Sequence, residues 1–324
     1  MCSKKRKGTS RRGLPTAQNS RPSSGIHASD APGQLRFIPV RPLGSGGLCE
    51  ITSAKDLLHL EYDDGFPLVA IKRLHTKYEQ NSIARRLLAR EFFITRNISH
   101  PGVVRIFDLH EEKGSLLLSM ELLTGSTLYD LLGQHPSGLG KAAWPLAHQL
   151  FETLTQLHGL GIAHGDIKPA NLMLERGDRL VLLDFNTADI IPHAGTATSR
   201  ISQGLRSSLG LAACSLLHAS PERLEGLPPS FADDIFAACC TIIELMEGAH
   251  PFARHTSLEA RNAGMPPRPL MEKTVAGKML LRGISFNPAI RPAARELAHI
   301  FRPQATFTVR CRSALRALLT SRHG

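Results

Sequence analysis

Two neighbouring segments of the chain hold a set of polar side chains that could form a reactive site. These side chains are Asp166, Lys168, Asn171 and Asp184. The segments 162–173 and 180–186 read as short strands that end in turns, and Pro169 does not fit the interior of a helix. Because adjacent loops would carry groups of both charge signs, the sequence indicates a candidate site here.

A glycine cluster nearer the start of the chain could contact phosphate. Residues 37–51 predict a strand, a turn and a second strand, and the turn contains Gly44 and Gly46. Glycine at such a turn lets backbone amides approach a phosphate closely. An ordinary hairpin turn explains the same cluster about equally well, so the glycines alone do not decide the function.

A lysine inside an apolar strand pattern predicts an ion pair. Lys72 lies in the segment 69–74, and a lysine buried there needs an anionic partner. The helical pattern over 79–98 places Glu91 beside its apolar stripe. If that helix packs on the strand, Glu91 can meet Lys72.

The elements that must position these groups change in type along the chain. Apolar runs at 103–107 and 116–120 predict two more strands, so the first part should be a small antiparallel sheet with one helix. After Glu121 the pattern becomes helical, at 128–132, 142–160 and 231–246.

Taken in order over residues 37–303, these motifs resemble the eukaryotic-type Ser/Thr protein kinase family. The layout looks like that of a soluble bacterial eukaryotic-like kinase. The motifs that carry the resemblance are Val69-Ala-Ile-Lys72, Glu91, His164-Gly-Asp166 with Asn171, Asp184-Phe-Asn186, Ser220-Pro-Glu222, Asp234 and Arg291. The resemblance implies an α+β, bilobal protein-kinase fold. Its N-lobe, a small antiparallel β-sheet with one helix, would span 37–121, and its larger, mainly helical C-lobe would span 122–303.

The resemblance implies ATP and Mg²⁺ as cofactors. Lys72, paired with Glu91, would hold the α- and β-phosphates under the loop of Gly44 and Gly46. Other residues would surround the adenine ring: the side chains of Ile51, Ala70, Met120 and Met173, with backbone groups near Glu121 and Leu123.

The resemblance also assigns the catalytic and metal-binding roles. Asp166 would accept the proton of the acceptor hydroxyl, and Lys168 would stabilise the migrating γ-phosphate. Asn171 and Asp184 would supply the oxygen ligands that suit Mg²⁺. Ser215 would contact Asp166 and Lys168.

The implied substrates are proteins with Ser/Thr acceptors, because a lysine two residues after Asp166 resembles Ser/Thr kinases. Gly165 keeps a second interpretation open, since small-molecule kinases of the aminoglycoside and choline type also carry His-Gly-Asp, there followed by Leu-His. Here Lys168 replaces that histidine. A third interpretation is a catalytically impaired pseudokinase scaffold that keeps the fold.

Three residues depart from the family pattern. Cys49 stands in place of the third loop glycine, and Asn186 replaces the glycine of Asp-Phe-Gly. Gly165 replaces the arginine that, in many members, holds a phosphate on the activation segment. We therefore expect weak dependence on phosphorylation of the segment 187–219. The family pattern further predicts that Arg291 pairs with the glutamate of Ser-Pro-Glu.

Most of the excess charge lies outside the motifs. The chain has 324 residues and a formal net charge of +11, and the first 36 residues hold eight basic side chains and one acid. That segment is rich in Ser, Pro and Gly, so 1–36 is expected to be a disordered basic tail. Residues 304–324 form a second basic tail with the pattern of a short amphipathic helix.

The same composition bears on partners and location. Residues 1–36 contain no aromatic side chain, which argues against a specific nucleic-acid partner. No apolar stretch reaches the ~18 to 20 residues of a transmembrane segment. The six cysteines form no CxxC pair, which favours free thiols and a cytoplasmic location.

Overall fold

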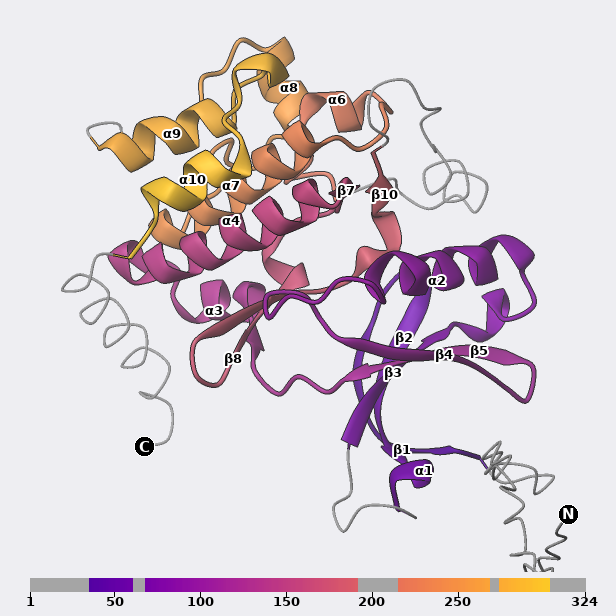
Figure 1. Cartoon of the computed structure of the whole chain (residues 1–324). Coiled ribbons are helices and arrows are strands. Elements are labelled where there is room, and N and C mark those ends of the chain that lie inside the picture. The colour runs from indigo at the N-terminus through magenta and orange to yellow at the C-terminus, as the bar shows by residue number, and fades with distance from the viewer. Residues whose placement is uncertain (1–34, 61–67, 192–214, 269–273, 304–324) are drawn as a thin grey trace, which may run out of the picture.

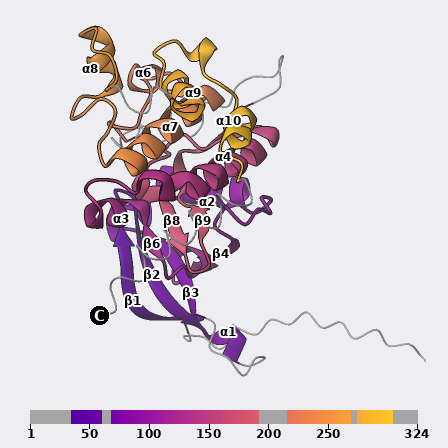
Figure 2. The same ribbon diagram turned by 90° about the vertical axis from the view of Figure 1, so that its left-hand side faces the viewer.

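The computed structural model of the chain describes residues 35–60, 68–191, 215–268 and 274–303, which fold into two lobes (Figure 1). Figures 1 and 2 show a sheet at one end of the molecule and a group of helices at the other. The N-lobe contains β1 (Phe37–Ser45), β2 (Cys49–Asp56), α1 (Leu57–Leu60), β3 (Leu68–Leu74), η1 (Thr76–Tyr78), α2 (Ser82–Thr95), β4 (Ile106–Glu112) and β5 (Ser115–Glu121). This arrangement confirms the α+β class expected from the sequence.

The five N-lobe strands form one antiparallel sheet in the order β1-β2-β3-β5-β4. Asn81 is the N-cap of helix α2, and its side chain accepts hydrogen bonds from two backbone amides of the first turn. Its buried face, with Leu87, Leu88 and Phe92, packs against Leu74 and other apolar residues of the sheet. Burial of this stripe fixes the helix on the strand that carries Lys72.

One strand begins later in the sequence than expected. The apolar run 103–107 predicts a strand over its whole length, but β4 begins only at Ile106. Val103 and Val104 turn toward the C-lobe, where Val103 forms an isolated bridge with Leu182 and Val104 donates to the Leu182 carbonyl at 3.1 Å. These residues are apolar because they are buried between the lobes.

The C-lobe is mainly helical, with short strands near the N-lobe (Figure 1). Its elements are β6 (Ser126–Thr127), α3 (Leu128–Gln134), η2 (Gly140–Ala143), α4 (Trp144–Gly159), β7 (Ile162–Ala163), η3 (Pro169–Asn171), β8 (Leu172–Glu175), β9 (Arg179–Leu182), η4 (Phe185–Thr187), β10 (Asp189–Ile190), α6 (Pro221–Leu224), α7 (Phe231–Glu247), α8 (Ser257–Asn262), α9 (Val275–Gly283), η5 (Pro288–Ile290) and α10 (Ala294–Ile300). Strands β6, β8 and β9 form a small sheet, and β7 pairs with β10. These short strands frame the segments that hold the candidate site.

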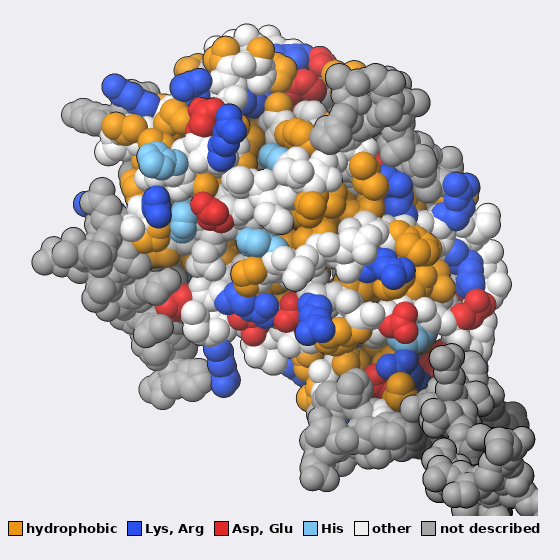
Figure 3. Space-filling view, in the orientation of Figure 1, with side chains coloured by type: hydrophobic (Ala, Val, Ile, Leu, Met, Phe, Trp, Pro, Cys, Tyr) orange, Lys and Arg blue, Asp and Glu red, His pale blue; other side chains and the backbone are white. Residues whose placement is uncertain are grey.

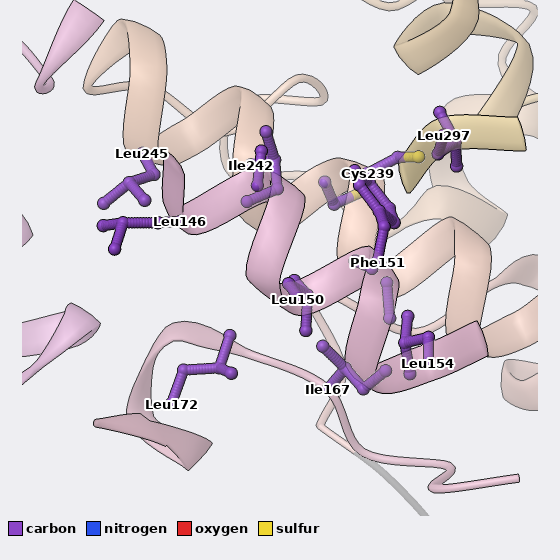
Figure 4. Packing of buried hydrophobic residues seen from close by; sticks show 14 of the residues in the cluster. Leu146, Leu150, Phe151, Leu154, Ile167, Leu172, Cys239, Ile242, Leu245 and Leu297 are labelled. Atoms are coloured by element: carbon purple, nitrogen blue, oxygen red, sulfur yellow. The ribbon is translucent and has the colours of Figure 1, made fainter. Parts of the chain in front are cut away.

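The C-lobe core forms between α4, α7 and α10 (Figure 4). Leu150 and Phe151 of α4 belong to this core, as do Ile167 from the loop that follows β7 and Leu172 at the start of β8. Ile167 is 1% exposed, so the residue between Asp166 and Lys168 is anchored in the core. Burial of Ile167 therefore fixes the position of the loop on which those two polar side chains stand.

The described part of the chain begins slightly before the expected N-lobe boundary. Arg36, which the sequence places in the tail, forms a two-point ion pair with Asp56, with distances of 2.8 and 2.7 Å. This arginine therefore belongs to the folded body. Residues 1–34 of the expected tail 1–36, and all of the expected tail 304–324, lie outside the described residues. Among the helices that the structure describes, none is long and apolar enough to span a membrane.

Candidate active site

The loop between β7 and β8 carries the first part of the candidate site. Its backbone is held by Asp234, near the start of α7, whose buried carboxylate accepts from the amides of His164 and Gly165 at 2.8 Å each. His158 of α4 also contacts this carboxylate, at 3.1 Å. The start of the loop is thus tied to two helices, which fixes the direction in which Asp166 leaves it.

Asp166 and Lys168 of this loop contact each other and Ser215, which comes from a later segment of the chain. The Lys168 Nζ lies 2.8 Å from Asp166 Oδ2 and 2.6 Å from Ser215 Oγ. The Ser215 amide donates to Asp166 Oδ1 at 2.9 Å. The expected contact of Ser215 with both residues is therefore confirmed. Burial raises the pKa of Asp166, but the charge of Lys168 and the hydrogen bonds from Lys168 and Ser215 outweigh it and hold the pKa below its usual value. Asp166 is a carboxylate at neutral pH.

Asn171 lies on the same loop and points its amide nitrogen toward Asp166. Its Nδ2 donates to the Asp166 carbonyl at 2.8 Å and to Asp166 Oδ2 at 3.2 Å. The Leu183 amide donates to the Asn171 backbone carbonyl at 2.9 Å. Since Leu183 directly precedes Asp184, this bond brings the two expected metal ligands onto neighbouring backbone segments.

Lys72, Glu91 and Asp184 form the second part of the site. The Lys72 Nζ lies 2.7 Å from both carboxylate oxygens of Glu91 and 2.7 Å from Asp184 Oδ1. The expected pairing of Lys72 with Glu91 is confirmed, and Lys72 is only 4% exposed. Burial lowers the pKa of Lys72, but the charges of Asp184 and Glu91 outweigh it and raise the pKa above its usual value. Lys72 is therefore a fixed cation between two carboxylates that come from different lobes.

Asp184 has a constrained backbone and a second local partner. Its φ of +60° lies in the left-handed region. The Asn186 side chain donates to Asp184 Oδ1 at 2.7 Å, so this oxygen accepts from both Asn186 and Lys72. Burial raises the pKa of Asp184, but the charge of Lys72 outweighs it and keeps the pKa below its usual value. The sequence analysis did not predict the contact of Asn186 with Asp184.

The donor set fits a hard divalent cation. Asn171 uses its amide nitrogen within the loop, which leaves the amide oxygen as a ligand, and Asp184 accepts only through Oδ1 among the described residues. Carboxylate and amide oxygens are the ligands that Mg²⁺ prefers. Asn171 and Asp184 are therefore suited to hold Mg²⁺.

The glycine turn between β1 and β2 is held by its own backbone and by His75, the residue after β3. The Gly46 amide donates to the Cys49 carbonyl at 2.8 Å, and the His75 ring contacts the Gly46 carbonyl at 2.7 Å. A Cβ atom at Gly44 would meet nothing within 4 Å, so packing within the protein does not require glycine there. The absence of a side chain at Gly44 leaves space for a group that approaches the backbone.

An apolar cluster lies between the two lobes beside this turn. Among the expected adenine-contacting residues, it contains Ala70 and Met120 with Ile51 and Leu123 at its edge. Met173 is not part of the cluster, but it pairs with Val181 across strands β8 and β9. The cluster also contains Val104 and Val181, which the sequence analysis did not select although both lie in the apolar runs it identified.

The segment that joins the lobes offers free backbone groups. The Glu121 amide donates to the Arg105 carbonyl at 2.9 Å, and its side chain pairs with Arg179 at 2.8 Å. The backbone amide and carbonyl of Leu123 make no hydrogen bond to another described residue. Backbone groups beside the apolar cluster are thus available to the edge of a flat ring.

The departures at Cys49 and Gly165 have clear structural settings. Cys49 is 6% exposed and packs among Leu74 and residues of α2, so its side chain faces the N-lobe core and not the glycine turn. Gly165 has a φ of +78°, and an added Cβ would lie 3.1 Å from the Thr187 carbonyl oxygen. A side chain at position 165 would be strained and crowded.

Arg291 lies outside the candidate site and binds Glu222, which follows Ser215 along the chain. Its guanidinium donates to both Glu222 carboxylate oxygens, at 3.0 and 2.9 Å, which confirms the expected pair. It also donates to the carbonyls of Ser285 and Ala232. This arginine connects the end of the segment that contains Ser215 to the helical core.

Comparisons with known proteins agree with this geometry. The family described as "Protein kinase domain" matches residues 37–298. The chain is 28% identical over 261 residues to "Serine/threonine-protein kinase PknD" of Mycobacterium tuberculosis, covering 78% of this chain and 37% of that protein. It is 32% identical over 221 residues to "Serine/threonine-protein kinase pkn2" of Myxococcus xanthus, covering 67% of this chain and 25% of that protein.

A third relative is "Serine/threonine-protein kinase PkaA" of Streptomyces coelicolor, 29% identical over 236 residues, covering 71% of this chain and 42% of that protein. The matched part thus spans less than half the length of each of these relatives. The family match, in contrast, extends over most of this chain and includes both lobes and every residue of the candidate site. The chain belongs to the protein kinase domain family.

Proposed function

We propose that this chain is an ATP-dependent Ser/Thr protein kinase that transfers the γ-phosphate of ATP to Ser or Thr hydroxyls of protein substrates. The observation that carries the proposal is the contact of Asp166 and Lys168 with Ser215, on the segment that leads into Ser220-Pro-Glu222. This contact supplies a carboxylate and a cation at the place where an acceptor hydroxyl would approach.

The acceptor hydroxyl attacks the γ-phosphorus, the bond to the β-phosphate oxygen breaks, and ADP leaves. Asp166 accepts the hydroxyl proton, because its lowered pKa keeps it ionised at neutral pH. Lys168 stabilises the charge on the phosphoryl group during transfer. Because Lys168 also contacts Ser215, ordering of that segment and placement of the cation are linked.

Lys72 binds the α- and β-phosphates, and Glu91 keeps its Nζ directed toward them. Gly44 and Gly46 cover the phosphates with backbone amides. The cluster of Ala70 and Met120, with Ile51, Leu123 and Met173, contacts the adenine ring. Backbone groups at Glu121 and Leu123 bind the edge of the ring.

Asn171 and Asp184 hold Mg²⁺ in this proposal, through an amide oxygen and a carboxylate. When bound, Mg²⁺ would supply positive charge beside the nucleotide phosphates. Asn186 and Lys72 orient Asp184 for that task, since both donate to its Oδ1. No observation favours the small-molecule kinase or the pseudokinase scaffold.

The setting proposed for this activity is the cytoplasm. Cys239 and Cys240 are buried and form no disulfide with another described residue, and burial raises the pKa of both thiols. Buried thiols of this kind suit a reducing compartment. On the face drawn in Figure 3, basic and acidic side chains are interspersed among the described residues, which supports protein substrates over a specific nucleic-acid partner.

A phosphate-transfer assay tests the proposal. The parent and the variant Asp166→Asn are incubated with radiolabelled ATP, Mg²⁺ and a general protein acceptor. We expect label on Ser and Thr with the parent and a loss of at least about 100-fold with the variant, the range of general base catalysis. Equal incorporation by both proteins would contradict the assignment of Asp166 and favour a scaffold.

A further inference from the structure

Helix α2 carries a second charged contact directly beside the one already described. Arg90 precedes Glu91 and forms an ion pair with Asp189 of β10. Asp189 is 2% exposed, and the side chain of Arg90 is 17% exposed. The sequence analysis assigned no role to either residue.

Asp189 lies where three parts of the site meet. It follows Asp184 by five residues, and it pairs with Ala163 in the two-stranded sheet of β10 and β7. Ala163 immediately precedes His164, which begins the loop that carries Asp166. The ion pair therefore joins α2 to the segment after Asp184 and to the strand that leads into the catalytic loop.

The two neighbouring residues of α2 make contacts in different directions. Consecutive residues on an α-helix are rotated by about 100° relative to each other, because one turn takes 3.6 residues. Glu91 contacts Lys72 in the N-lobe sheet, and Arg90 contacts Asp189 in the C-lobe. Together the two ion pairs fix both the position and the rotation of the helix between the lobes.

Because Asp189 is buried, separating its ion pair with Arg90 is energetically costly. Separating a buried carboxylate from a cation costs free energy, so the structure is destabilised when Arg90 moves away from Asp189. Any displacement of α2 that separates Glu91 from Lys72 also tends to separate Arg90 from Asp189. Displacement of the helix therefore costs two ion pairs and not one.

We propose that Arg90 and Asp189 are positioning residues that hold α2 so that Glu91 stays in contact with Lys72. The inference rests on the proposed function, because Lys72 is the residue taken to bind the nucleotide phosphates. The charge of Asp189 is part of the sequence, so this contact needs no phosphorylation. Gly165, whose Cβ position is crowded by the Thr187 carbonyl, contributes no cation to it.

The experiment uses the full chain with Arg90→Met, Asp189→Leu and the double variant. Replacing both members of a buried ion pair with apolar side chains commonly preserves folding, which thermal unfolding will verify. We expect kcat/KM for ATP to fall about tenfold in each single variant and also about tenfold in the double variant. Independent residues would give about a 100-fold loss in the double variant. Arg86→Ala, an exposed arginine on the same helix, is the matched control and should change kcat/KM less than twofold.

A second arm tests whether the pair acts through Glu91. In a Glu91→Gln background, Arg90→Met should change kcat/KM less than twofold, because the Lys72–Glu91 ion pair that it supports is already lost. A full tenfold effect there would show that Arg90 acts by another route and would overturn the inference. After both proteins are treated with phosphatase, kcat/KM of Arg90→Met should still be about tenfold lower than that of the parent.

Nucleotide binding separates this inference from the proposed function. The Kd for ATP with Mg²⁺, measured by calorimetric titration, should rise about tenfold in Arg90→Met and stay unchanged in Arg86→Ala. An inactive parent that shows this shift would contradict the proposed kinase function but support the positioning role. If Arg90→Met has the same activity and the same ATP affinity as the parent, the positioning role alone is overturned.

Discussion

Asp234→Asn is the substitution for which the structure allows the most detailed prediction. The Asp234 carboxylate is buried and accepts from the backbone amides of His164 and Gly165 with its two oxygens. Asparagine keeps one acceptor oxygen but places an NH₂ group against the other amide. The variant therefore loses the negative charge and leaves a buried N–H without an acceptor.

The cost follows from these two changes. A hydrogen bond to a charged group contributes about 1.5–3 kcal/mol, and an unsatisfied buried donor costs about 1–3 kcal/mol. Because the second oxygen still accepts, we expect a loss of about 3 kcal/mol in the free energy of unfolding. We also expect kcat to fall at least about tenfold, because the loop that carries Asp166 is no longer held by both amides, whereas KM for ATP should change little.

Urea unfolding followed by circular dichroism measures the stability of Asp234→Asn, and steady-state kinetics gives kcat. Asp130→Asn is the matched control, since Asp130 is an exposed carboxylate in the first turn of α3 that accepts from the amide of the N-cap residue Thr127, and its replacement should cost only about 1 kcal/mol. A loss below about 1 kcal/mol in Asp234→Asn, with kcat unchanged, would refute the view that this carboxylate holds the loop.

Three further predictions follow from the contacts of the site. Lys168→Met removes the charge that keeps the pKa of Asp166 low against the effect of burial, so this pKa should rise. As the pH is lowered, the variant should therefore lose activity at a higher pH than the parent, which a pH profile of kcat will show. Arg291→Ala leaves Glu222 without its two-point partner and should lower the free energy of unfolding by about 3 kcal/mol in urea, while Arg291→Lys restores only part of it. Asn171→Ala should raise the Mg²⁺ concentration needed for half-maximal activity at least about tenfold, and a metal titration that matches the parent would contradict its role as a ligand.

Much of the site could be predicted because its residues lie at recognisable points of regular elements. The period of the helix around Glu91 and the apolar strand around Lys72 were sufficient to predict their contact. The turn imposed by Pro169 likewise indicated that Asp166 and Asn171 would lie on one loop. In these cases local patterns carry the information, since burial of one face fixes what the other face can reach.

The remaining contacts depend on how distant segments pack. Arg90 and Asp189 are 99 residues apart, and neither has a sequence pattern that points to the other. The contact of Asn186 with Asp184 accompanies a left-handed backbone at Asp184, and the local sequence pattern did not predict either feature. The apolar character of Val103 suggested a strand, whereas its burial between the lobes is a tertiary effect.

The central claim is that this chain transfers phosphate from ATP to protein hydroxyls with Asp166 as the base. Tandem mass spectrometry of acceptor proteins, after incubation with ATP, Mg²⁺ and either the parent or Asp166→Asn, tests it most directly. The account predicts new phosphoserine and phosphothreonine with the parent and almost none with the variant. Equal phosphate occupancy with both proteins, or phosphate found on no protein side chain, would contradict it.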